Sequence, residues 1–413
     1  MEILSASYLL PISAPPIEGG AIAFNNGVIE AVGTLKDIKR QFTAPIREYP
    51  GAVIMPGLVN AHAHLELTNF AKWCTDKGIT ETPSNYIEWI LKVIKCKKAL
   101  TEEDYSSAIK TGAELLIKSG TTSVGDILSC CNVLGVYENL KLSGRIYLEL
   151  IGHDKEACKN GLEAAINKTK KITCRFLAGL SPHTPFTLSP EYLREIDIAA
   201  EELSLPLTMH IAESYEESAF FENSIGGIAE ILYPLAGWGA YLPMPQKTTP
   251  VKFLENKGLI KEGLLAVHAV HLDREDALIL KKHKNSIVLC PRSNEKLKVG
   301  KAPVKLFKEL DIPLALGTDS LASNDSLSLW DEMRYFMDSY TGFFSPSEIL
   351  KIGTLGGAKA IQTEKETGTL EKGKSADILV VEPAQTPKNG SVEEQLLEGE
   401  IVCSVWVKGV EAM

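Results

Sequence analysis

The sequence predicts an α/β fold, a (β/α)8 TIM barrel with a small β-sandwich domain formed by both chain termini. Two observations lead to this fold class. Eight short apolar runs alternate with amphipathic segments through the middle of the chain, and further strand-like segments stand at each end. The length of 413 residues suits one large α/β domain with an appendage. We place the small β domain at residues 1–54 and 366–413, and the barrel at residues 55–365.

Both ends of the chain contribute to the predicted β domain. Residues 21–32 form a predicted hairpin with Asn26-Gly27 at its turn, a dipeptide typical of tight hairpins. Strand-like segments return after Gly368, at residues 376–381 and 401–407. We expect the two termini to pair into one domain beside the barrel.

The eight apolar runs are the predicted strands of the barrel. Near-continuous apolarity is typical of parallel strands that are covered on both faces. The runs cover residues 53–60, 122–128, 145–150, 175–180, 206–210, 264–268, 286–289 and 313–317. Eight such βα units over about 300 residues indicate a TIM barrel.

The segments between the runs carry helix signals. Thr101 begins a capping motif, and apolar residues at helical spacing follow it up to a stop at Gly120. Ser189 and Pro190 form a second helix start, with Ser at the cap and Pro in the first turn. Residues 214–262 are unusually long for a βα connection, so this segment is either a lid that shapes the substrate site or an extra packing helix.

Composition and charge limit the possible binding partners of the protein and indicate its cellular compartment. The net charge of -10, from 43 basic and 53 acidic residues, argues against a nucleic-acid-binding surface. No run approaches the roughly 20 apolar residues that span a membrane, and the N-terminus resembles no signal peptide. None of the 8 cysteines forms a Cys-x-x-Cys motif, which fits reduced thiols in a cytoplasmic protein. The oligomeric state stays open, although enzymes of this size often form homodimers.

His62 and His64 are the most informative residues of the chain. They end a buried apolar run in the pattern His-x-His. Side chains alternate between the two faces of a strand, so both imidazoles point to the same side. Two neutral imidazoles in this arrangement can bind one divalent metal ion.

Other polar residues stand at the predicted ends of later strands. These ends are where TIM-barrel enzymes carry their active sites. His183 follows the fourth strand, His210 and Glu213 follow the fifth, His268 ends the sixth and Asp319 ends the eighth. One such histidine alone would be explained by core packing, but the alignment of all these strand ends predicts a shared catalytic site.

Three imidazoles and one carboxylate form the predicted metal site. The predicted ligands are His62, His64, His210 and Asp319. This mixed nitrogen and oxygen set suits one divalent ion, with Zn²⁺ as the first choice and Fe²⁺ as the alternative. A water molecule in the remaining position would have its pKa lowered towards roughly 7. Glu213 is not needed as a ligand and is placed for proton transfer, while His268 would orient the attacking water or stabilise charge.

The identity and order of these residues resemble the amidohydrolase superfamily over nearly the whole chain. The resemblance is carried by His62 and His64 after the first strand, His210 and Glu213 after the fifth, His268 after the sixth and Asp319 after the eighth. No lysine ends the third or fourth strand, so the chain looks like the mononuclear branch with cytosine, guanine and adenosine-type deaminases. The resemblance implies a hydrolase that acts on a carbon–nitrogen bond of a cyclic amidine, with Asp319 accepting the proton of the attacking water.

Two segments, residues 317–327 and 330–334, resemble the group that holds S-adenosylhomocysteine deaminases and triazine hydrolases. The resemblance implies that His183 and Ser323 contact the sugar of a nucleoside substrate. The chain departs from those deaminases in one place. No Pro-x-Glu follows the helix that contains Trp89, and in those deaminases this carboxylate holds the ribose hydroxyls.

Four further segments look closer to the aminodeoxyfutalosine deaminases of menaquinone biosynthesis. They are residues 86–94, 119–125, 147–152 and 290–294. This likeness implies an adenosine derivative with a carboxylated aromatic group, against which Trp89 would pack. Arg145 or Arg292 would pair with the carboxylate, since guanidinium suits bidentate carboxylate binding. An ordinary structural salt bridge is an equal alternative for either arginine.

The predicted small-molecule substrate is therefore 6-amino-6-deoxyfutalosine, which would yield futalosine and ammonia. The first alternatives keep the same reaction on S-adenosylhomocysteine, methylthioadenosine or adenosine. A second alternative uses the same site on a triazine or on guanine. A third is a barrel without catalysis, which the presence of all predicted ligands disfavours.

Overall fold

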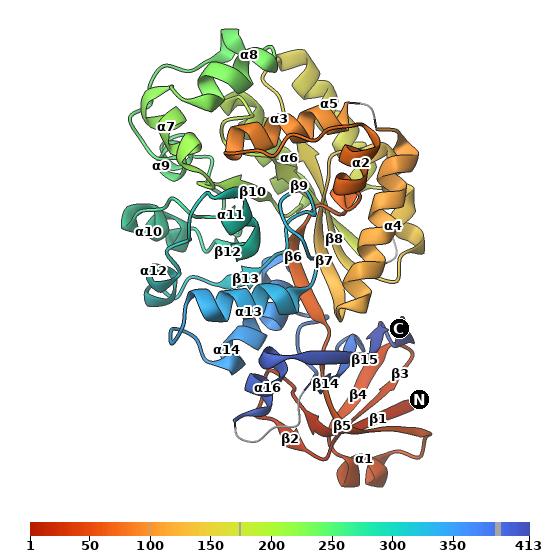
Figure 1. Ribbon diagram of the computed structural model, residues 1–413. Helices are drawn as coiled ribbons and strands as arrows, with labels where there is room; N and C mark the ends of the chain where they lie inside the picture. Colours follow the sequence, from red (N-terminus) through yellow and green to blue (C-terminus); the bar gives the residue numbers. More distant parts are fainter. Residues whose placement is uncertain (99, 173–174, 385–389) are drawn as a thin grey trace.

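The computed structural model describes residues 1–98, 100–172, 175–384 and 390–413 (Figure 1). Eight strands form the barrel of the larger domain. They are β6 (Leu58–Ala63), β7 (Thr121–Leu128), β8 (Ser143–Leu150), β9 (Phe176–Pro182), β10 (Thr208–Ile211), β11 (Leu265–His268), β12 (Ser286–Leu289) and β13 (Leu314–Leu316). The first four and the last four form two parallel sheets. Bridges between Leu180 and Leu207 and between Ala63 and Asp319 close them into a ring. The predicted barrel is confirmed.

The first predicted strand, residues 53–60, is two strands in the structure. β5 (Ile46–Pro56) belongs to the terminal sheet, and β6 begins the barrel after Gly57. The Gly57 amide donates to the Asp377 carbonyl at 3.0 Å, and a Cβ at Gly57 would lie 2.2 Å from Thr122 Cγ2. The apolar run is continuous because the end of β5 and all of β6 are buried. The point at which the chain passes from the small domain into the barrel therefore cannot be recognised from the hydrophobic pattern.

The two chain termini build the small β domain, which lies below the barrel in Figure 1. Its strands are β1 (Glu2–Leu9), β2 (Ile17–Glu18), β3 (Gly20–Asn25), β4 (Val28–Thr34), β5, β14 (Ile378–Pro383), β15 (Glu400–Val407) and β16 (Val410–Glu411). They form one sheet in the order β16-β15-β14-β5-β1-β3-β4, with β2 paired to β1. β3 and β4 are the predicted hairpin, and β5 pairs with β14. The predicted domain from both termini is therefore confirmed.

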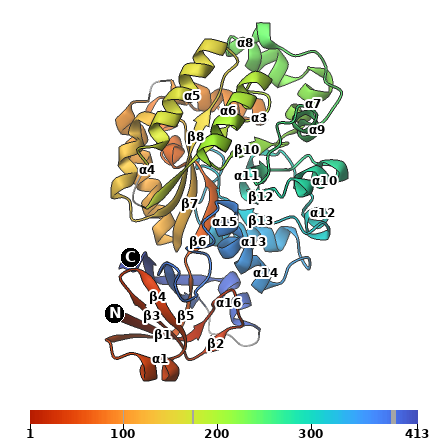
Figure 2. The same ribbon diagram turned by 180° about the vertical axis from the view of Figure 1, so that it is seen from behind.

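Helices cover the outside of the barrel, as the view from behind in Figure 2 shows. They include α4 (Glu102–Lys118), α5 (Lys155–Thr169), α6 (Pro190–Leu203), α10 (Arg274–Lys282), α12 (Val304–Glu309), α13 (Leu329–Ser339) and α14 (Pro346–Lys351), while α15 (Gly357–Ala360) packs against the barrel strands themselves. The predicted caps are present, because Thr101 accepts from the Asp104 amide and Ser189 from the Tyr192 amide. In the described part of the chain, no helix has the length and apolar character needed to cross a membrane. The seven cysteines described there are free thiols, and Cys174 lies outside the described residues.

Two excursions extend beyond the C-terminal ends of the barrel strands. After β6 the chain forms α2 (Phe70–Asp76) and α3 (Tyr86–Lys97). After β10 the long connection forms α7 (Tyr215–Asn223), a π-helical turn (Ile228–Leu232), α8 (Tyr233–Leu235) and α9 (Pro250–Asn256). Both excursions lie in the upper part of Figure 1, over the end of the barrel that carries the strand-end polar residues.

Candidate active site

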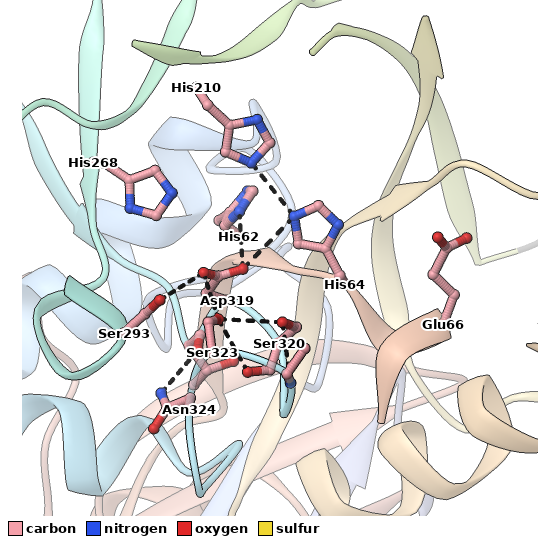
Figure 3. Close-up of polar contacts among 12 residues, drawn as sticks. His62, His64, Glu66, His210, His268, Ser293, Asp319, Ser320, Ser323 and Asn324 are labelled. Carbon is pink, nitrogen blue, oxygen red and sulfur yellow. Dashed lines mark hydrogen bonds and ion pairs between the residues drawn. The ribbon is translucent and has the colours of Figure 1, made fainter. Parts of the chain in front are cut away.

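Four histidines and one aspartate from distant parts of the chain meet at the C-terminal end of the barrel (Figure 3). They are His62 on β6, His64 directly after it, His210 on β10, His268 at the end of β11 and Asp319 just beyond β13. The His62 ring lies 4.9 Å from the His64 ring and 4.9 Å from the His210 ring, between centroids. The alternation of side chains on β6 thus places both members of the His-x-His pattern at one centre.

The His62 imidazole is the clearest indication that this cluster is a metal-binding site. The side chain is fully buried, and neither ring nitrogen has a hydrogen-bond partner among the described residues. Burial lowers the pKa of His62 well below its usual range, so the ring is neutral and offers a lone pair. A buried nitrogen without a partner is costly unless something else satisfies it. A divalent metal ion would do so.

The hydrogen bonds of the other histidines orient them for the same purpose. His210 Nδ1 donates to the His183 carbonyl at 2.9 Å, and His268 Nδ1 donates to Asn294 Oδ1 at 3.0 Å. A carbonyl oxygen only accepts, so Nδ1 carries the proton in each ring and Nε2 keeps its lone pair. His64 Nε2 lies 3.4 Å from His210 Nε2. Metal-binding histidines are typically oriented by such bonds.

Asp319 presents one carboxylate oxygen to the histidines and the other to two serines. Oδ1 lies 3.8 Å from His62 Nε2 and 3.7 Å from His64 Nε2. Oδ2 accepts hydrogen bonds from Ser293 Oγ at 2.7 Å and from Ser323 Oγ at 2.8 Å. The serines therefore fix the rotation of the carboxylate, and Figure 3 shows both beside it.

Glu213 lies beside the cluster but is held by other partners. Tyr86 donates its hydroxyl to Glu213 Oε2 at 2.7 Å, and Oε1 lies 3.7 Å from His268 Nε2. Burial raises the pKa of the Glu213 carboxyl. A carboxyl with a raised pKa can carry a proton at neutral pH and deliver it to a bound molecule.

A cavity of about 380 Å³ opens onto this cluster. Its polar end contains His64, His210, Glu213, His268 and Asp319. Its apolar wall comes from the two excursions and is formed by Ile90, Val93 and Ile94 of α3 and by Leu232, Leu235 and Trp238 of the long connection. The segment 214–262 therefore helps to shape the cavity, and it does so with several short helices rather than one.

Only some of the predicted substrate-binding residues line the cavity. His183 and Trp89 line the cavity. Ser323 is fully buried behind Asp319 and is not among the described residues that line the cavity. Ser323 therefore contacts the Asp319 carboxylate, whereas the family resemblance implied a contact with the sugar of the substrate.

Neither predicted arginine is among the described residues that line the cavity. Arg145 Nε donates to the Ile361 carbonyl at 2.9 Å and its Nη1 to the Ala178 carbonyl, so its guanidinium bonds to the backbone. Arg292 forms ion pairs with Asp325 and Asp331, which is the ordinary structural role left open for it.

Four polar residues of the site carried no assigned role in the sequence. Tyr86 and Lys97 come from α3, Ser293 from the short helix α11 (Pro291–Leu297) after β12, and Glu149 from β8. Tyr86, Lys97 and Glu149 line the cavity. Tyr86, Glu149 and Ser293 stand in segments that resemble aminodeoxyfutalosine deaminases, but no motif marks these residues individually. For Tyr86 and Lys97, α3 reaches the site only through its packing over the barrel.

The comparison with protein families agrees with this geometry. The model of the amidohydrolase family matches residues 53–411. The chain belongs to the amidohydrolase family. The predicted enzyme class, a hydrolase that acts on a carbon–nitrogen bond, is thereby confirmed.

Several relatives resemble this amidohydrolase along most of its length. A 5-methylthioadenosine/S-adenosylhomocysteine deaminase of Moorella thermoacetica is 32% identical over 97% of the chain and 91% of the relative. An aminodeoxyfutalosine deaminase of Deinococcus radiodurans is 29% identical over 83% of the chain and 81% of the relative. Among solved structures, an adenosine deaminase of Xanthomonas campestris with bound zinc superposes with a TM-score of 0.86 at 25% identity, over 100% of this chain and 92% of that one.

Proposed function

We propose that this amidohydrolase is a metal-dependent hydrolytic deaminase of 6-aminopurine nucleosides. The observation that carries the proposal is the buried histidine cluster beside Glu213 at the base of one cavity, in which neither His62 ring nitrogen has a hydrogen-bond partner among the described residues. The residues that would hold the metal are His62, His64, His210 and Asp319. Zinc is the first choice, since imidazole and carboxylate suit it and a similar solved structure contains it. When bound, it would supply a water of lowered pKa.

The protein groups then divide the proton transfers between them. The water oxygen forms a bond to C6 of the purine, while Glu213 gives its proton to the adjacent ring nitrogen. Asp319 accepts the proton that leaves the water, and its Oδ1 is free for this because both serines donate to Oδ2. His268 holds the attacking oxygen through Nε2, which its bond to Asn294 leaves unprotonated. Asp319 then gives its proton to the amino group, the carbon–nitrogen bond breaks and ammonia leaves. The remaining hydroxyl proton at C6 returns to Glu213, so the product carries a C6 carbonyl and keeps the proton on the ring nitrogen.

For the nucleoside itself, we propose 5′-methylthioadenosine or S-adenosylhomocysteine ahead of aminodeoxyfutalosine. Seven similar proteins that match most of this chain are named 5-methylthioadenosine/S-adenosylhomocysteine deaminase, among them those of Moorella thermoacetica and Carboxydothermus hydrogenoformans. The cavity adds a physical reason. Its wall of Ile90, Val93 and Leu235 suits the uncharged methylthio group of 5′-methylthioadenosine, whereas the two arginines expected to bind a substrate carboxylate are engaged elsewhere.

A substrate panel followed by ultraviolet absorbance tests this proposal. Metal-loaded enzyme is given 5′-methylthioadenosine, S-adenosylhomocysteine, aminodeoxyfutalosine, adenosine and guanine. We expect the highest kcat/KM for one of the first two compounds. Fastest turnover of aminodeoxyfutalosine would restore the preference drawn from the sequence, and turnover of guanine alone would overturn the nucleoside proposal.

The substitution Glu213→Gln tests the assigned proton donor. The amide keeps the shape of the side chain and can still accept from Tyr86, but it cannot supply the proton. We expect metal content to stay unchanged while kcat falls by about 10²- to 10⁴-fold. A variant with near-wild-type turnover would contradict the assignment.

A further inference from the structure

Glu149 is a buried carboxylate in the cavity that the proposed reaction does not use. It lies on β8, its side chain is only 9% exposed, and it lines the same cavity as Glu213 and Asp319. Among the described residues, no hydrogen bond holds its carboxylate, and His183 Nε2 lies 3.9 Å from Oε1. A buried carboxylate without a hydrogen bond is costly, which points to a partner supplied by the bound molecule.

Lys97 brings a positive charge to the same part of the cavity. Its Nζ donates to Glu66 Oε1 at 2.9 Å and to Ser129 Oγ at 2.7 Å. Glu66 is buried and also accepts from the Ser129 amide, so the ammonium has a rigid anchor. An ammonium has three hydrogens to donate, and these two bonds leave one for a ligand. The cavity therefore offers an acceptor, Glu149, and a donor, Lys97.

This pair of opposite charges selects the kind of group that can bind. A ligand carboxylate would be repelled by Glu149, and a ligand ammonium would be repelled by Lys97. A neutral hydroxyl suits both, because it donates to one partner and accepts from the other. Two adjacent hydroxyls can use both partners at once, and charge-assisted hydrogen bonds of this kind are the strong ones.

The location fits the sugar of a nucleoside. Glu149 borders His183, whose ring centroid lies 5.2 Å from that of His210 in the metal-binding cluster. A group at Glu149 is thus one side chain away from the reacting end of the cavity. Of the described carboxylates that line the cavity, Glu213 and Asp319 belong to the reacting end, which leaves Glu149 for the remainder of the substrate.

We propose that Glu149 and Lys97 bind the vicinal hydroxyls of the substrate's sugar, so that the enzyme selects ribonucleosides over deoxyribonucleosides. This inference rests on the proposed nucleoside deaminase function and adds the specificity-determining residues. Glu149 accepts from the hydroxyls, and Lys97 donates to one of them.

The test compares metal-loaded wild-type enzyme on matched substrates. These are adenosine with 2′-deoxyadenosine and 3′-deoxyadenosine, and 5′-methylthioadenosine with its 2′-deoxy analogue. We expect loss of a hydroxyl to lower kcat/KM by about 10- to 100-fold, mainly through KM. Equal values for ribo and deoxy substrates would overturn the inference and leave the deaminase function standing. No turnover of any purine nucleoside would overturn both.

The variant Glu149→Gln tests whether this residue causes the preference for substrates that carry the sugar hydroxyls. It should lower kcat/KM for adenosine by about tenfold and change the value for 2′,3′-dideoxyadenosine, which has neither hydroxyl, by less than about threefold. Glu163→Gln, at an exposed position on α5, is the matched control and should change neither. An equal loss on both substrates in Glu149→Gln would overturn the inference. The wild-type comparison decides it if this variant does not fold.

Discussion

At the scale of single residues, the two serine hydroxyls that donate to one oxygen of Asp319 allow a test of how the carboxylate is oriented. Ser293 and Ser323 both donate to Oδ2, which directs Oδ1 towards His62 and His64. A hydrogen bond to a charged group contributes about 1.5–3 kcal/mol. We expect Ser323→Ala to lower kcat by about tenfold with KM little changed, because the carboxylate loses part of its orientation.

Steady-state kinetics with measurement of bound metal check this expectation. Ser293→Ala, which removes the other donor to the same oxygen, should behave in the same way. A rise in KM at constant kcat in Ser323→Ala alone would instead support the sugar contact implied by the family resemblance.

At the scale of elements, the connection between β10 and β11 supplies part of the cavity wall. Leu235 lies in this connection, lines the cavity and is 55% exposed, so its truncation costs little stability. We expect Leu235→Ala to raise KM for 5′-methylthioadenosine several-fold, since apolar contact with the thioether is lost. Leu203→Ala, at the exposed end of α6, is the matched control. An unchanged KM in Leu235→Ala would mean that this segment only packs against the barrel.

Helix α6 carries a buried acid that makes stability depend on pH. Asp197 is buried, its Oδ2 has no hydrogen-bond partner in the described part of the chain, and burial raises the pKa of its carboxyl to about 7. The pKa in the unfolded chain is about 3.9. The folded protein therefore binds this proton more tightly, and stability is lost as the pH rises from about 4 through 7.

Asp197→Asn should remove this loss. We expect the free energy of unfolding to rise by about 1–3 kcal/mol at pH 8, with a smaller gain at pH 5. Urea unfolding at the two pH values measures the difference, with Glu195→Gln at an exposed position of the same helix as control. An equal gain at both pH values would show that the carboxylate is not the cause.

At the scale of the whole molecule, the parts predictable from sequence are those encoded by local patterns. Apolar runs located the barrel strands, and His62, His64 and Asp319 stand at strand ends, which a barrel brings together whatever the details of packing. The division of the run 53–60 at Gly57 was missed, because both halves are buried. Tyr86 and Lys97 were not assigned roles because the position of α3 over the cavity depends on tertiary packing. Arg292 looked available only because its partners, Asp325 and Asp331, lie far from it in the sequence.

The central claim is that the histidine and aspartate cluster holds a metal that the deaminase reaction needs. The most direct measurement is deamination of 5′-methylthioadenosine before metal removal by a chelator, after removal, and after addition of zinc, with bound metal determined at each stage. We predict that activity falls below about 1% in the metal-free protein and returns as about one equivalent of zinc binds. Full activity in protein shown to be free of metal would contradict the account.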